Sequence, residues 1–211
     1  EADAIVLPGG QPGVDHLMTC DTMKKIICIL IAYLSGNLLF GQYITKIIAG
    51  RDLVKESNDS NPGTANAFML GGMGCGIATL LCDLLKGFLP VAYFQDMFSD
   101  SLLFSFLMIA PVLGHAFPVM HGFRGGKGIA VSFGVLLGVS EDYRALIILI
   151  FYYLLFSALR VAPHSRRSII TYLCFTITSC ILIADKYIIY GCMGIAVIVI
   201  WKHKKAEMAQ V

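Results

Sequence analysis

Long apolar stretches alternate with short polar segments along almost the whole chain. A membrane-spanning helix needs about 20 mainly apolar residues, and fewer where other helices enclose it. The fourth stretch is short and follows Gly-Gly-Lys, so we expect it to be partly buried within the protein. The pattern predicts an all-α polytopic transmembrane bundle of about seven spans, or five with the same sidedness if the two weakest are removed. The predicted spans are residues 26–49, 68–94, 101–119, 127–139, 145–160, 168–184 and 187–201.

The composition agrees with a membrane protein. The 211 residues are 57% hydrophobic and 14% charged, whereas soluble domains contain about 25% charged residues. The apolar segments leave room for one membrane domain, which we place at residues 23–211. Residues 1–22 are polar and rich in Gly and Pro, and Met23-Lys24-Lys25 before an apolar run resembles a natural start. We therefore expect residues 1–22 to be a tail outside the fold.

Lysine and arginine gather in alternate loops. Ten lie in one set of loops and four in the other, and the positive-inside rule places the larger set in the cytoplasm. With seven spans, the N-terminus is then outside and the C-terminus cytoplasmic. The larger set is Arg51, Lys55, Arg124, Lys127, Arg160, Arg166, Arg167, Lys202, Lys204 and Lys205; the smaller is Lys24, Lys25, Arg144 and Lys186.

The internal loops of the cytoplasmic set also carry the unusual polar residues, in segments 56–68, 114–128 and 160–168. A transporter usually has polar features near the middle of the membrane in both halves of a repeat. Polar residues on one face instead favour an active site reached from the cytoplasm, and a small transporter is the alternative from another functional class.

The glycine-rich segment Gly122-Phe-Arg124-Gly-Gly-Lys127-Gly128 leads into an apolar stretch. Glycines let backbone N–H groups approach an anion, and a helix N-terminus with a nearby cation adds positive charge. The segment therefore predicts phosphate binding, although it is not a Walker A loop, because Gly128 replaces that motif's Ser or Thr. The alternative is a flexible loop carrying two cations.

Other candidates are weaker when each is taken alone. The segment Asn58–Asn66 can line a polar pocket or be an ordinary solvated loop. Asp83 and Lys86 share a helix face within a span, where charges are costly and often functional, although they can also neutralise each other. His115 is a candidate general base or a hydrogen-bond anchor. In the third loop Ser165, Arg166, Arg167 and Ser168 can bind phosphate, and the alternative is that the two arginines only set the topology.

The seven cysteines lie mostly in apolar stretches and form no Cys-x-x-Cys pair. We interpret them as small packing residues and predict neither a disulfide framework nor a metal site. The sequence gives no indication of a cofactor, a nucleic-acid partner or an obligate protein partner.

Taken together, the loop motifs resemble the PlsY family of bacterial membrane acyltransferases, from about Ile26 to the C-terminus. Gly36-Asn-Leu-Leu-Phe-Gly41 is similar to the family's G-S-I-P-x-G, and Asn61-Pro-Gly-Thr-Ala-Asn66 to its N-x-G-A-T-N. Asp83-Leu-Leu-Lys-Gly-Phe-Leu-Pro90 resembles D-x-x-K-G-x-x-P. The two most specific matches are Gly114-His-Ala-Phe-Pro-Val119 and Phe123-Arg-Gly-Gly-Lys-Gly-Ile-Ala130.

The resemblance implies a seven-helix bundle in the bacterial cell membrane that transfers an acyl chain from acyl phosphate to the 1-hydroxyl of glycerol 3-phosphate. It implies catalytic roles for Lys127, His115, Asn61 and Asn66. It also implies substrate contacts for Gly63, Thr64, Lys55, Asp83, Lys86, Gly125, Gly126, Gly128, Ser165 and Ser168.

Three departures from the family pattern concern the phosphate site of the acceptor. Asp59 stands where the family has a Ser that helps to hold the acceptor phosphate, Met69 replaces an Arg, and Lys55 replaces another Arg. Losing a cation and gaining a carboxylate should weaken a phosphate site. A different acceptor, or the same fold without activity, is therefore the main alternative, and Arg166 or Arg167 is a candidate to compensate.

Overall fold

The computed structural model describes residues 12–98 and 101–208, and all regular elements within these ranges are helical. The α-helices are α1 (Pro12–Gly36), α2 (Phe40–Ala49), α3 (Leu53–Glu56), α4 (Thr64–Phe94), α5 (Leu102–Ala116), α6 (Ile129–Gly138), α7 (Arg144–Ala158), α8 (His164–Leu182) and α9 (Lys186–Met208). Two 3₁₀ turns, η1 (Gln95–Phe98) and η2 (Val119–His121), precede and follow α5.

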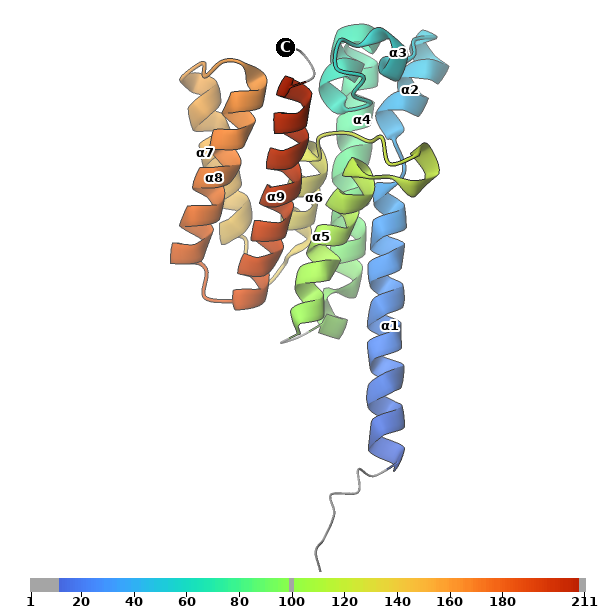
Figure 1. The fold of residues 1–211 in the computed structure, drawn as a ribbon, viewed down its shortest axis with the longest axis vertical. Coiled ribbons are helices and arrows are strands. Elements are labelled where there is room, and N and C mark those ends of the chain that lie inside the picture. Colours follow the sequence, from blue (N-terminus) through green and yellow to red (C-terminus); the bar gives the residue numbers. More distant parts are fainter. Residues whose placement is uncertain (1–11, 99–100, 209–211) are drawn as a thin grey trace, which may run out of the picture.

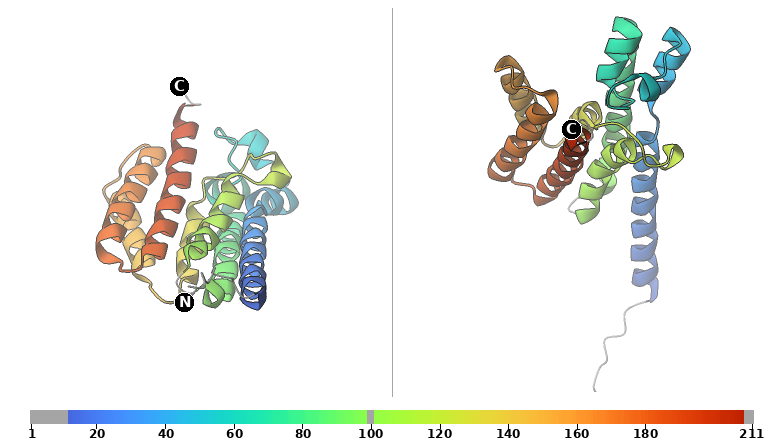
Figure 2. Two further views of the ribbon diagram at one scale, coloured as in Figure 1. Left: turned by 60° about the horizontal axis from the view of Figure 1, so that its bottom comes forward. Right: turned by 45° about the horizontal axis from the view of Figure 1, so that its top comes forward.

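Helix α5 lies in the middle of the bundle and packs against α1 on one side and α9 on the other. Helices α7 and α8 lie beyond α9, and α1 lies at the opposite edge (Figures 1 and 2). The core between these layers is apolar and fully covered, with Leu107 and Met108 of α5, Val135 of α6 and Val199 of α9 among its members. The predicted all-α transmembrane bundle is therefore confirmed as the fold class.

Four helical segments are long and apolar enough to cross a membrane: Cys20–Ala49, Thr64–Phe98, Leu102–His121 and Lys186–Met208. Helices α6, α7 and α8 correspond to the three other predicted spans, and the total of seven crossings stays a prediction. Helix α6 has 10 residues and is therefore about 15 Å long, half the thickness of the hydrocarbon core. Most of its side chains are buried, as expected for this segment.

The predicted first span, residues 26–49, is wrong as a continuous helix. The chain leaves the helical path between Gly36 and Phe40 and starts again as α2. Backbone carbonyls at this break have partners from side chains: Asn37 Nδ2 donates to Tyr33 O at 2.7 Å, and Lys86 Nζ donates to Leu38 O at 2.6 Å. These bonds stabilise irregular backbone inside the protein, which lipid alone does not.

Helix α1 begins at Pro12, so the expected boundary after residue 22 does not coincide with the start of an element. The lower part of α1 extends beyond the other helices (Figure 1). Residues 1–11 lie outside the described part of the chain, and the assignment of residues 1–22 to a tail outside the fold stays a prediction.

Glycines bring two pairs of helices into close contact. A Cβ added at Gly36 of α1 would lie 2.2 Å from Pro111 O of α5, and one added at Gly114 of α5 would lie 2.0 Å from Tyr33 O of α1. Helices α4 and α6 meet in the same reciprocal way, through Gly87 and Gly134. Small residues that let backbones approach are typical of helix contacts in membranes, and the second contact holds α6, the helix that follows Lys127, against α4.

Candidate active site

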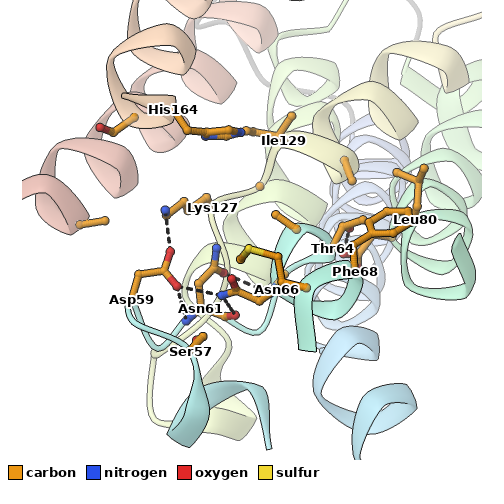
Figure 3. A pocket seen from close by; sticks show the side chains of 18 of the residues that line it. Ser57, Asp59, Asn61, Thr64, Asn66, Phe68, Leu80, Lys127, Ile129 and His164 are labelled. Carbon is orange, nitrogen blue, oxygen red and sulfur yellow. Dashed lines mark hydrogen bonds and ion pairs between the residues drawn. The ribbon is translucent and has the colours of Figure 1, made fainter. Parts of the chain in front are cut away.

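A cavity of about 760 Å³ lies where the segment 56–70, the start of α6 and the connection between α7 and α8 meet. Its polar side contains Asp59, Asn61, Asn66 and Lys127 (Figure 3). Another side is lined by apolar residues of α4, α6 and α7, which are Phe68, Leu80, Ile129, Phe133 and the ring of Tyr153. One cavity therefore joins a cationic, amide-rich site to an apolar wall.

Lys127 lies two residues before the first residue of α6 and reaches across the cavity to Asp59. Its Nζ lies 2.8 Å from Asp59 Oδ2, and the exposed fractions of the two side chains are 19% and 15%. Figure 3 shows the two groups pointing toward each other from different segments. The cation expected to bind phosphate is thus paired with the carboxylate expected to repel it.

The loop that carries Asp59 is held by its own polar side chains. Asp59 Oδ1 accepts from Asn66 Nδ2 at 2.8 Å and from the Asn61 backbone N–H at 3.3 Å. Asn66 Nδ2 also donates to Asn61 O at 2.7 Å, and Asn61 Oδ1 accepts from Gly63 N at 3.2 Å. Partial burial opposes ionisation of Asp59, but hydrogen bonds from Lys127 and Asn66 outweigh it and hold its pKa below the usual value.

A buried cluster of Asp83, Lys86 and His115 borders the cavity, with Asp83 and His115 among its lining residues and Lys86 behind them. Lys86 Nζ contacts Asp83 Oδ1 at 2.8 Å, donates to His115 Nδ1 at 2.8 Å, and reaches Leu38 O at the α1–α2 break. Since Lys86 occupies the Nδ1 lone pair of His115, that nitrogen is not free to act as a base. Of the two roles predicted for His115, the geometry favours the anchor.

His115 also holds the glycine segment that leads to Lys127. The Gly126 backbone N–H donates to His115 O at 3.0 Å. A Cβ at Gly126 would lie 2.1 Å from His115 Nε2, and one at Gly125 would lie 2.0 Å from His115 O. In this structure the two glycines therefore serve close packing on His115, which sets the path of the chain into Lys127.

Sequence reasoning missed Lys202 as part of this arrangement, because it counted Lys202 only among the cytoplasmic charges. Lys202 Nζ donates to Ala116 O and to Gly125 O, both at 2.9 Å, and lies 5.2 Å from the centre of the Phe117 ring. It thereby ties the end of α5 to the glycine segment. Its position at the end of an apolar helix gave no signal that distinguished it from a topology determinant.

Two further cavity residues were not predicted as site residues. Tyr153 of α7 and His164 at the start of α8 both line the cavity. Burial, with the positive charges of Arg167 and Lys127, lowers the pKa of His164. Behind it, the ring of His203 stacks on His164 with centres 6.1 Å apart.

The predicted site residues divide into three groups, which lie away from the cavity, behind it or along its wall. Lys55 is exposed and lies 3.9 Å from Asp52, away from the cavity, and Ser168 is buried and donates within α8 to His164 O. Lys86, Gly125 and Gly126 act behind the cavity, as described above. The predicted residues that line it are Asn61, Gly63, Thr64, Asn66, Asp83, His115, Lys127, Gly128 and Ser165.

Comparison with known proteins places this arrangement in a family. A family model described as "Glycerol-3-phosphate acyltransferase" matches residues 26–208, which include the whole cavity. A glycerol-3-phosphate acyltransferase of Thioalkalivibrio sulfidiphilus is 31% identical over 83% of this chain and 85% of that protein. One of Aliivibrio salmonicida is 40% identical over 60% of this chain. That match spans 65% of the Aliivibrio protein, a little under two thirds of its length.

The fold is similar to a crystal structure of PlsY (YgiH), described as an integral membrane glycerol 3-phosphate acyltransferase in its glycerol 3-phosphate form. The TM-score is 0.78 at 28% sequence identity, covering 89% of this chain and 92% of that one. The lysophosphatidic acid form of PlsY gives a TM-score of 0.74. The apolar helices and this similarity agree on a multi-pass membrane protein. The chain belongs to the glycerol-3-phosphate acyltransferase family.

Proposed function

We propose that this protein transfers the acyl chain of an acyl phosphate to the 1-hydroxyl of glycerol 3-phosphate, giving lysophosphatidic acid and inorganic phosphate. The observation that carries the proposal is the cavity that joins Lys127 and its surrounding amides to an apolar wall. Both substrates carry a phosphate, and the donor also carries an acyl chain, so the two chemistries of the cavity match the two parts of the donor. The names of the relatives and of the similar structures support the acceptor and the product of this reaction, because they are glycerol 3-phosphate acyltransferases with glycerol 3-phosphate and lysophosphatidic acid forms.

In this proposal, Lys127 binds a substrate phosphate, and Asn61 and Asn66 shape the polar side of the cavity. The acyl chain lies along Phe68, Leu80 and Phe133. Acyl phosphate is a mixed anhydride, so the acceptor hydroxyl can attack the acyl carbon directly, the bond from that carbon to the phosphate oxygen breaks, and the leaving phosphate can take up the hydroxyl proton. The protein then contributes positioning and stabilisation of charge, without a covalent intermediate.

We also propose that the cavity opens toward the cytoplasm of a bacterial cell, with the N-terminus outside. The α2–α3 connection, the α7–α8 connection and the end of α9, which carry Arg51, Arg160 and Lys204, lie at one end of the bundle (Figure 1), and the positive-inside rule supports a cytoplasmic position for that end. This orientation gives the water-soluble acceptor direct access from the cytoplasm. A transporter, the alternative from another class, has no support from the family comparison.

A membrane assay with acyl phosphate and labelled glycerol 3-phosphate tests the reaction. We expect labelled lysophosphatidic acid from the wild type and a loss of about 100-fold or more in Lys127→Ala, because one preorganised charge is removed from the site. Lys46→Ala is the matched control, since Lys46 is an exposed lysine on α2 and does not line the cavity. Equal product from wild type and Lys127→Ala would contradict the role of Lys127.

A different acceptor is the second candidate, because Asp59 adds a carboxylate to the polar side and Met69, 72% exposed, offers no charge. Donor hydrolysis without acylated glycerol 3-phosphate in the same assay would support it. Of the two arginines that are candidates to compensate, Arg167 has its guanidinium carbon 5.9 Å from the centre of the ring of Tyr153, a cavity-lining residue. Arg166 instead pairs with Glu207 at 3.2 Å.

A further inference from the structure

We propose that Asp59 is a tethered anion that occupies the phosphate-binding position of Lys127 until a substrate phosphate displaces it. The inference rests on the proposed function, because it concerns the same phosphate. In this proposal the Asp59 carboxylate competes with phosphate for Lys127 and so sets the affinity of the site for phosphate.

The surroundings of the Asp59 carboxylate resemble those that suit a phosphate. The carboxylate accepts from an ammonium group, a side-chain amide and a backbone N–H, contributed by Lys127, Asn66 and Asn61. These are donor types that bind oxyanions in proteins. A phosphate that reaches Lys127 therefore meets a position that already holds an anionic oxygen at 2.8 Å.

The contacts of Asp59 also suggest how it can leave. Its bonds to Asn61 and Asn66 lie within its own loop and the first turn of α4, whereas the contact with Lys127 crosses to the segment before α6. The loop can thus withdraw from Lys127 by breaking one ion pair while its internal bonds persist. A phosphomonoester carries a charge of about −1.5 to −2 at pH 7, more than one carboxylate, which favours exchange at the cation.

Displacement has a consequence for affinity. A phosphate that binds must replace the ion pair between Asp59 and Lys127 and then lie near the carboxylate of Asp59, which has a charge of the same sign. Asp59 therefore lowers the apparent affinity of the protein for phosphate. The competing interpretation is that Asp59 orients Lys127 productively, in which case its removal would weaken phosphate binding. The two interpretations predict opposite signs for the same substitution.

The test measures binding of inorganic phosphate to the purified full-length protein in detergent by titration calorimetry. We expect Asp59→Asn to bind phosphate about tenfold more tightly than the wild type. The same substitution should have no effect in a Lys127→Met background, because the competition requires the lysine. Asp142→Asn is the matched control, since Asp142 forms an ion pair with Arg144 at 2.7 Å and does not line the cavity.

Unchanged or weaker phosphate binding in Asp59→Asn would overturn the proposal, and so would an equal gain in the Lys127→Met background. Asp59→Ser, which also removes the charge, should show the same gain and replaces Asp59→Asn if that variant does not fold. Because binding is measured without turnover, a failure of acyl transfer with these results intact would reject the proposed reaction and leave the displacement standing.

Discussion

Lys86 shows how one side chain can connect several parts of the site. Its ammonium group contacts Asp83, His115 and the carbonyl of Leu38, and the side chain is buried. Lys86→Met would leave a buried carboxylate without its counter-charge and the helix break without a donor. Breaking such a pair from one side costs about 3–5 kcal/mol, so we expect a large fall in the unfolding temperature, measured in detergent.

Adding Asp83→Asn to Lys86→Met should recover part of that loss, because the unpaired charge is removed. Lys46→Met, at an exposed position of α2, is the control and should leave the unfolding temperature unchanged. A double variant less stable than Lys86→Met alone would show that the ion pair is not the main contribution of Lys86.

Single residues differ in how far the sequence reveals their partners. The pairing of Asp83 with Lys86 follows from their spacing of three on one helix face, and it is confirmed at 2.8 Å. The pairing of Asp59 with Lys127 joins positions 68 apart, which no local pattern connects. The sequence therefore predicts only that Asp59 repels the substrate phosphate. It does not indicate that Asp59 forms an ion pair with Lys127.

At the scale of elements, glycines decide how closely helices approach. We expect Gly36→Ala to destabilise the bundle by about 1–3 kcal/mol, because the new methyl group would push α1 away from the α5 backbone. Gly74→Ala, in α4, is the control: an added Cβ there meets open space among the described residues, and alanine has the higher helix propensity. Thermal unfolding of the two variants checks the difference, and a Gly36→Ala variant as stable as Gly74→Ala would refute the close contact.

Hydropathy predicts the existence of these elements better than their interruptions. Helices α5, α6, α7 and α8 begin and end within four residues of their predicted ranges, because burial in lipid or protein requires long apolar stretches. The break between α1 and α2 was missed because Asn37-Leu38-Leu39 lacks proline and stays mostly apolar. Its carbonyls are stabilised by Lys86, which lies 48 residues further along the chain. Breaks that depend on distant donors leave little local signal.

At the scale of the whole molecule, the connections between helices divide between two ends of the bundle. The α2–α4 and α7–α8 connections lie at the end where α9 finishes, and the α6–α7 and α8–α9 connections lie at the other (Figure 1). The first group borders the cavity. The division of charged loops inferred from the sequence thus corresponds to two ends of one structure, and the side of the membrane that each end faces can be tested directly.

Cysteine labelling in intact bacteria provides that test, in a background where the exposed Cys20 and Cys180 are replaced by serine. With the proposed orientation, a membrane-impermeant maleimide should label Glu141→Cys from outside, and should label Asn58→Cys only after the cells are opened. Both positions are exposed, so burial does not explain a difference. Labelling of Asn58→Cys in intact cells would invert the topology and place the Lys127 cavity outside the cell. Glycerol 3-phosphate from the cytoplasm would then have no direct path to the site, because a charged phosphate does not cross the hydrocarbon core unaided.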